Sequence, residues 1–171
     1  MPITALKKTP VMIEEDLELD VQWAGGPSPL SKAADFELWV RAALEDVEGP
    51  VELVIRVVDE AEGRELNHRY RGKDQPTNVL SFPFEAPPGI ESHHLGDLVI
   101  CAPVVVREAQ EQGKSLGDHL AHLVIHGVLH LRGYDHQTDE QAALMESHEK
   151  ELLQGLGISD PYVQTDGAVQ G

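Results

Sequence analysis

The chain has 171 residues, of which 41% are hydrophobic and 25% are charged, a composition that excludes a disordered protein. Its formal net charge of −17 argues against a general affinity for nucleic acid, because binding to a polyanion gains from many basic residues. A single cysteine excludes an internal disulfide, and no apolar run reaches the roughly 20 residues that span a bilayer. We therefore expect a cytoplasmic protein with no membrane partner and no disulfide partner.

Periodic patterns predict the elements in chain order. Alternating apolar residues predict a strand within 11–23, and Ser31 is expected to cap a helix that runs to about Leu44. Strands are predicted at 51–58, 79–84 and 95–100. Helices are predicted at 60–70 behind the cap Asp59, at 103–112, from Ser115 or Asp118 to 131, and from 138 to Gly155 or Gly157. These elements predict one α/β (α+β) domain over 1–160, with a flexible tail over 161–171.

Three histidines stand out near the end of the long central helix. His126 and His130 are one helical turn apart, about 6 Å along the axis, so both imidazoles can reach one ion. His136 cannot share that face in a straight helix, and Gly133 would allow the chain to turn back because glycine tolerates positive φ. Three neutral imidazoles favour zinc and leave a fourth position for water, which is typical of a catalytic site.

The same spacing also occurs in zinc peptidases, but one residue differs. A peptidase helix of this type has a glutamate directly after its first histidine as the general base, and this chain has Gly127 there. A zinc peptidase therefore remains an alternative, although without its usual agent of proton transfer.

Three blocks of the sequence carry a family resemblance. Residues 126–136 resemble the signature of the YbeY family, bacterial metal-dependent endoribonucleases that mature ribosomal RNA, and residues 66–84 and 95–100 resemble two further stretches of that family. The resemblance implies a mixed four-stranded sheet packed against helices, with a central metal-bearing helix. It also implies a single-strand-type endoribonuclease that acts in small-subunit 3′ end maturation and ribosome quality control.

The resemblance further implies the cofactor and partners. We expect one zinc ion, with another divalent transition metal as the alternative, held by His126, His130 and His136. The expected partners are ribosomal RNA and the small ribosomal subunit, together with a ribosomal protein and a ribosome-associated GTPase. A metal-stabilised ribosome assembly factor without catalytic activity is a third reading.

Arg71 is the fourth predicted catalytic residue, beside the three histidines. Its planar guanidinium can hold two oxygens of a phosphate, and the resemblance matches it to a functional arginine of the family. A salt bridge with Asp74 is the structural alternative. A positive groove could also form from the densest basic cluster together with Arg132; the cluster consists of Arg64, His68, Arg69, Arg71 and Lys73.

Other polar residues receive weaker predictions. Asp97 could orient a ligand histidine by accepting a hydrogen bond from the ring nitrogen that does not bind the metal, a contact that metal-bound imidazoles usually make. His122 is a candidate general acid, whereas Asn78 receives no catalytic role. The adjacent pair His93 and His94 is expected to be surface, because neighbouring residues of an extended chain point apart. Cys101 is expected to be a buried small hydrophobe.

Overall fold

The computed structural model describes residues 16–161, in which four strands and six helices of at least four residues are formed. In chain order they are β1 (Leu17–Trp23), α2 (Leu30–Ala33), α3 (Phe36–Ala43), β2 (Val51–Val58), α4 (Glu60–Arg71), β3 (Val79–Pro83), β4 (His94–Cys101), α5 (Ala102–Gln112), α6 (Leu116–Leu131) and α7 (Asp139–Gly155). The predicted tail beyond residue 161 and the start of the predicted first strand at 11–15 lie outside the described residues.

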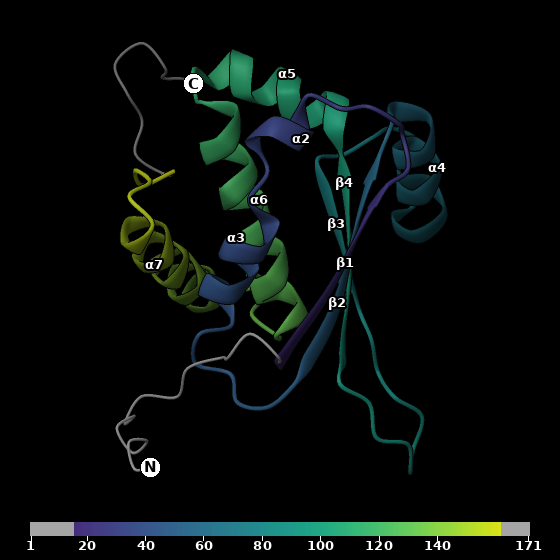
Figure 1. Cartoon of the computed structure of the whole chain (residues 1–171), viewed down its shortest axis with the longest axis vertical. Coiled ribbons are helices and arrows are strands. Elements are labelled where there is room, and N and C mark those ends of the chain that lie inside the picture. The colour runs from purple at the N-terminus through teal and green to yellow at the C-terminus, as the bar shows by residue number, and fades with distance from the viewer. Residues whose placement is uncertain (1–15, 162–171) are drawn as a thin grey trace.

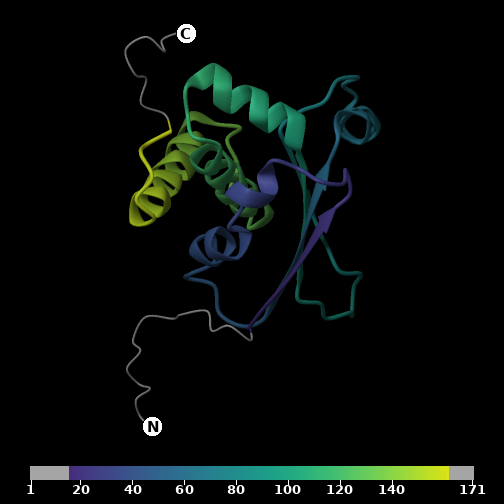
Figure 2. The ribbon, with the colours of Figure 1, turned by 45° about the horizontal axis from the view of Figure 1, so that its top comes forward.

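The strands form one mixed sheet in the order β1-β2-β4-β3. β1, β2 and β4 are parallel, and β3 runs antiparallel to β4 at the edge. Helix α4 lies on one side of the sheet, and the remaining helices lie on the other (Figures 1 and 2). The predicted mixed four-stranded sheet packed against helices is therefore confirmed.

Helix α6 is the centre of the larger helical layer. It packs against α3, α5 and α7 and against strands β3 and β4. Its residues Leu120, Val124 and Val128 are fully buried, which agrees with the apolar character of nearly the whole helix. Within the described part of the chain, none of the helices has both the length and the apolarity to cross a bilayer.

Local capping signals explain where several helices begin. The Asp59 carboxylate accepts a hydrogen bond from the Glu62 amide at 2.9 Å, and Ser115 Oγ accepts one from the Asp118 amide at 3.1 Å. Thr138 forms a capping box with Gln141 at the start of α7. These three starts agree with the sequence predictions.

The helix predicted from Ser31 to Leu44 is wrong in two respects. The chain is extended at Ala34, which separates α2 from α3. Leu30 of α2 and Phe36 of α3, on either side of this break, are both buried. Ser31 is also not a cap, because it lies within α2, whose N-cap residue is Pro29; the Leu30 amide donates to Ser28 Oγ at 3.1 Å.

Candidate metal centre

The three predicted histidines converge at the end of α6. The potential ligand nitrogens of His126, His130 and His136 all lie within 4.8 Å of one another. Two of the rings come from successive turns of α6, and the third comes from the turn that follows. Gly133 takes φ 102° in that turn, a conformation that other residues rarely adopt, and so allows the chain to bring His136 back.

Contacts from two helices hold this turn in place. Arg132 donates to the Ala43 carbonyl at 2.8 Å and pairs with Asp46 at 3.0 Å, which ties the turn to the end of α3. The Tyr134 ring stacks on His148 of α7 at 5.4 Å between centroids. Arg132 is therefore engaged in a structural contact and does not contribute to the predicted positive groove.

The outer nitrogens of the two helical histidines are both engaged with oxygen acceptors. His130 Nδ1 lies 3.0 Å from the Tyr134 carbonyl, and His126 Nδ1 forms a short contact with the Glu149 carboxylate. A carbonyl can only accept, so His130 Nδ1 carries its proton, and an ionised Glu149 would place the proton of His126 on Nδ1 in the same way. In the neutral form each ring then has its lone pair on Nε2, and these two nitrogens face each other at 3.1 Å.

Two facing lone pairs suit a shared cation. Tetrahedral zinc with nitrogen ligands at about 2.0–2.1 Å places two ligand atoms about 3.3 Å apart, close to the observed separation. Burial, followed by the neighbouring imidazoles of His126 and His136, also lowers the pKa of His130 and so favours its neutral, ligand-competent form. The donor set and its spacing therefore fit a divalent transition metal.

The histidines open into a cleft of about 680 Å³. Its walls come from α6, from the turn after α6 and from the edge strand β3, and they include Arg71 at the end of α4. The Arg71 guanidinium makes one long hydrogen bond to the Ser81 carbonyl, at 3.5 Å. The structure thus brings all four predicted catalytic residues to one cleft.

Arg71 is the one arginine among residues 16–161 for which no ion pair with a carboxylate is formed. Six arginines each pair with a carboxylate, and Asp74, the predicted alternative partner of Arg71, pairs instead with Arg64 at 2.7 Å. The six pairs are Arg41–Glu37, Arg56–Glu62, Arg64–Asp74, Arg69–Glu65, Arg107–Glu60 and Arg132–Asp46. Arg71 has no carboxylate within ion-pair distance among residues 16–161, so its charge is available to an anionic ligand in the cleft.

Gly127 is a position where α6 packs closely against strand β4. A Cβ atom at this position would lie 2.7 Å from a methyl carbon of Leu98 and 3.4 Å from Ser81 Oγ. Leu98 is fully buried on β4 and cannot move aside cheaply. A glutamate at this position would therefore require Leu98 or α6 to shift.

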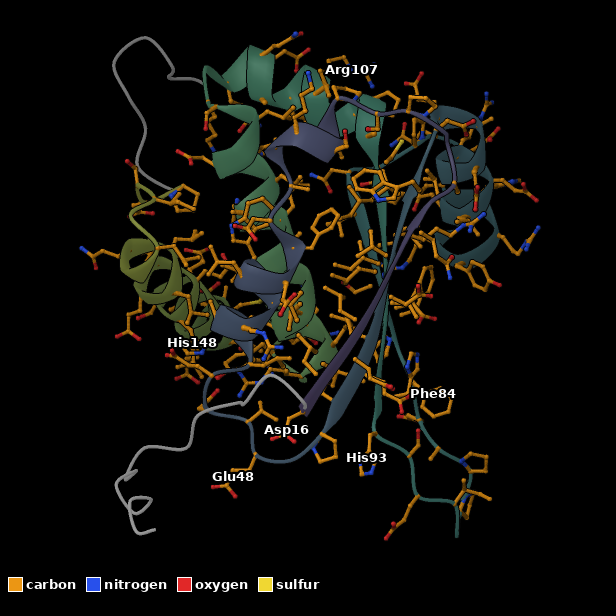
Figure 3. All side chains as sticks on the ribbon, in the orientation of Figure 1. Asp16, Glu48, Phe84, His93, Arg107 and His148 are labelled. Atoms are coloured by element: carbon orange, nitrogen blue, oxygen red, sulfur yellow. The ribbon has the colours of Figure 1, made fainter. Side chains whose placement is uncertain are left out.

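Two predictions about β4 and the loop before it are wrong. Asp97 does not reach the histidine cluster but pairs with His94 Nε2 at 2.9 Å. Its neighbour Leu98 contacts α6, so Asp97 points to the opposite face of the sheet, as the strand pleat requires. Of the pair predicted to be surface, His93 is exposed as expected, whereas His94 is half-buried against Phe84. In Figure 3 His93 and Phe84 lie at the lower end of the sheet, on the opposite side of the view from His148 of α7.

The remaining polar residues have partners that explain their burial. His119 donates to Glu108 at 2.9 Å, and Asn78 donates to the same carboxylate at 3.0 Å. Burial alone would raise the pKa of Glu108, but these two hydrogen bonds outweigh it and hold the pKa below its ordinary value. Cys101 is buried, as predicted, and burial raises the pKa of its thiol.

Sequence reasoning missed Glu149, which contacts both His126 and His122. A signal for it exists in the sequence, because Glu149 occupies the apolar stripe of α7 between Met145 and Leu152. An acidic residue on the buried face of an amphipathic helix requires a buried partner.

The fold and the cleft together define a class of protein: an α+β domain with a histidine-rich cleft suited to a divalent metal. A family model described as Endoribonuclease YbeY matches residues 29–157. The Endoribonuclease YbeY of Alkalilimnicola ehrlichii is 60% identical over 154 residues, which cover 85% of this chain and 91% of that protein. The chain therefore belongs to the YbeY endoribonuclease family.

A solved structure gives the same result for the fold. The solution structure of a Thermotoga maritima protein, TM1509, matches with a TM-score of 0.50 and 27% sequence identity. The match covers 84% of this chain and 99% of that one. The arrangement of the mixed sheet and its helices is therefore shared with that protein.

Proposed function

We propose that this chain is a metal-dependent endoribonuclease that acts in small-subunit ribosomal RNA maturation and ribosome quality control. The observation that carries the proposal is the free charge of Arg71 beside three convergent imidazoles in one cleft. In a chain with 30 acidic and 13 basic residues, a cation left without a carboxylate partner is well suited to an anionic substrate. Family membership supports RNA as that substrate.

The chain's own residues have distinct roles in this proposal. His126, His130 and His136 hold one divalent ion, with zinc favoured by the all-imidazole donor set. A bound ion of this kind supplies Lewis-acid chemistry at a phosphate oxygen or a water molecule. Arg71 binds the scissile phosphate through its two-pronged guanidinium and stabilises the charge that develops there.

The proposal extends to setting and partners. The described residues share one main core, which supports a single hydrolase domain. We propose the cytoplasm as its location and the small ribosomal subunit, a ribosomal protein and a ribosome-associated GTPase as its partners. A pull-down from ribosome-containing extract with the wild-type chain, analysed for small-subunit components, tests this part.

The decisive experiment compares Arg71→Ala with Arg64→Ala on single-stranded ribosomal RNA. Both changes remove one exposed arginine from α4, but Arg64 is already paired with Asp74 and its side chain is 58% exposed. We expect cleavage by Arg71→Ala to fall about 100-fold or more, as for loss of a donor that stabilises a transition state. Cleavage by Arg64→Ala should stay within about threefold of the wild-type rate, as expected for an exposed ion pair of small energy.

Parallel reactions separate the alternatives. Each protein is also incubated with casein, and every reaction is repeated with a chelator. Cleavage of casein alone would favour a zinc peptidase. If neither substrate is cut and the chelator unfolds the chain, a non-catalytic assembly factor is favoured. RNA cleavage that is insensitive to both Arg71→Ala and the chelator would refute the proposed mechanism.

A further inference from the structure

Glu149 is the buried carboxylate of this fold. Among residues 16–161 it is the one acidic side chain classed as buried, and its exposed fraction is 0%. It lies on α7, 23 residues after His126, and contacts Nδ1 of that ring, whereas Nε2 of the same ring faces His130. Burial of an ionised carboxylate is costly unless hydrogen bonds compensate it, so its partners are informative.

Both carboxylate oxygens face imidazoles of α6. One oxygen contacts His126 Nδ1, and the other lies 3.3 Å from His122 Nε2. An ionised carboxylate has no proton to donate, so with Glu149 in that form both imidazoles direct an N–H group toward it. His122 therefore uses its Nε2 proton to hold Glu149 in place.

The contact with Glu149 determines which nitrogen of His126 can bind a ligand. A neutral imidazole has one proton, and an Nδ1 proton directed to Glu149 leaves the lone pair on Nε2. That nitrogen faces His130 Nε2 at 3.1 Å, within the histidine cluster. With the opposite tautomer, His126 would direct an N–H group at the place where the ion is held.

We propose that Glu149 is a positioning residue for the metal centre. It fixes the tautomer and the ring orientation of His126, and its negative charge behind the ring offsets part of the charge of a divalent ion. His122 holds the carboxylate from its other side. This inference rests on the proposed function, in which His126 is a metal ligand.

The test uses metal affinity and does not depend on RNA cleavage. Glu149→Leu removes both acceptors, and Glu149→Gln keeps the shape of the side chain but offers only one acceptor oxygen. Glu151→Gln is the matched control, because it makes the same charge change on α7 at a side chain that is 76% exposed. Zinc affinity is measured by competition with a chromogenic chelator, and folding of each metal-free variant by circular dichroism.

We expect Glu149→Leu to bind zinc 10–100-fold more weakly than the wild type, the range of about 10–100-fold known for residues that support metal ligands. The zinc affinity of Glu149→Gln should fall about tenfold for the same reason, and the zinc affinity of Glu151→Gln should equal that of the wild type. If Glu149→Leu does not fold, the zinc affinity of Glu149→Gln alone tests the positioning role. Affinity within threefold of the control in the folded variants would overturn the positioning role.

A spectroscopic measurement tests the tautomer directly. In metal-free protein labelled with ¹⁵N-histidine, long-range proton–nitrogen spectra should show His126 protonated at Nδ1, and Glu149→Leu should abolish this preference. Protonation of wild-type His126 at Nε2 would overturn the proposal. Two zinc ions per chain, one of them lost in His122→Ala but retained in His130→Ala, would also overturn it, because His122, His126 and Glu149 would then be ligands of a second site.

The outcomes separate this inference from the function it rests on. If the wild-type chain binds no divalent metal, the proposed function fails. If His130→Ala abolishes zinc binding while both Glu149 variants retain it, the metal centre stands and only the role of Glu149 fails.

Discussion

Replacement of Gly127 by alanine tests the packing that disfavours a peptidase base. The new Cβ would lie 2.7 Å from a methyl carbon of Leu98, whereas carbon atoms in contact are about 3.5–4.0 Å apart. Leu98 is fully buried, so either this residue or α6 must shift by about 1 Å. Such overpacking costs about 1–3 kcal/mol, and the higher helix propensity of alanine returns up to about 1 kcal/mol.

We therefore expect Gly127→Ala to lower the free energy of unfolding by about 0.5–2 kcal/mol in urea denaturation. Gly117→Ala is the control on the same helix, because its Cβ would meet only the Ala33 carbonyl, at an ordinary 3.7 Å. The control should be neutral or stabilising by up to about 1 kcal/mol. If Gly127→Ala is as stable as Gly117→Ala, α6 can move from the sheet at no cost and our steric argument against a glutamate is refuted.

Three further predictions concern stability. Gly96→Ala should lower the free energy of unfolding by about 2 kcal/mol or more, because its Cβ would lie 2.6 Å from the Phe82 carbonyl oxygen; thermal unfolding measures the loss. The folded-state pKa of Glu108 lies below its ordinary value near 4.5, so its stabilisation is present above that pH and is lost as pH falls through the lower pKa. Acid unfolding should therefore be steeper for the wild type than for Glu108→Gln, and equal slopes would contradict this. Zinc at about 100 times its dissociation constant should stabilise the wild type by about 2.7 kcal/mol, an effect that His136→Ala removes.

Most elements could be predicted because their signals are local. The strand β2 (Val51–Val58) is a run of β-branched and apolar residues, and the structure has the predicted bounds. The starts of α4, α6 and α7 depend on a side chain within three residues of each cap. Such signals need no knowledge of the remainder of the fold.

The break between α2 and α3 could not be predicted in the same way. The apolar pattern from Leu30 to Leu44 is compatible with one helix, and no proline or glycine interrupts it after Leu30. In the structure α2 and α3 each pack against α6, with Leu30 and Phe36 both buried, and this fit to α6 is a requirement of tertiary packing. Sequence periodicity contains no information on that requirement.

The wrong prediction for Asp97 has a different cause. Its place in a strand was predicted correctly, but the face to which it points depends on register against α6. Leu98 meets Gly127, so Asp97 must face the other side and pairs with His94. The sequence predicts that Asp97 lies in a strand. It does not show which face of the sheet packs against α6, so the direction of the Asp97 side chain stays open.

The metal centre depends both on local sequence signals and on tertiary packing. His130 receives its supporting acceptor, the Tyr134 carbonyl, from four residues further along the chain. His126 receives its acceptor, Glu149, from 23 residues further along and from another helix. The spacing of His126, His130 and His136 was therefore sufficient to predict that three imidazoles converge. The orientation of the first of them depends on how α7 packs against α6, so replacement of Glu149 should weaken metal binding while every residue of the sequence signature remains in place.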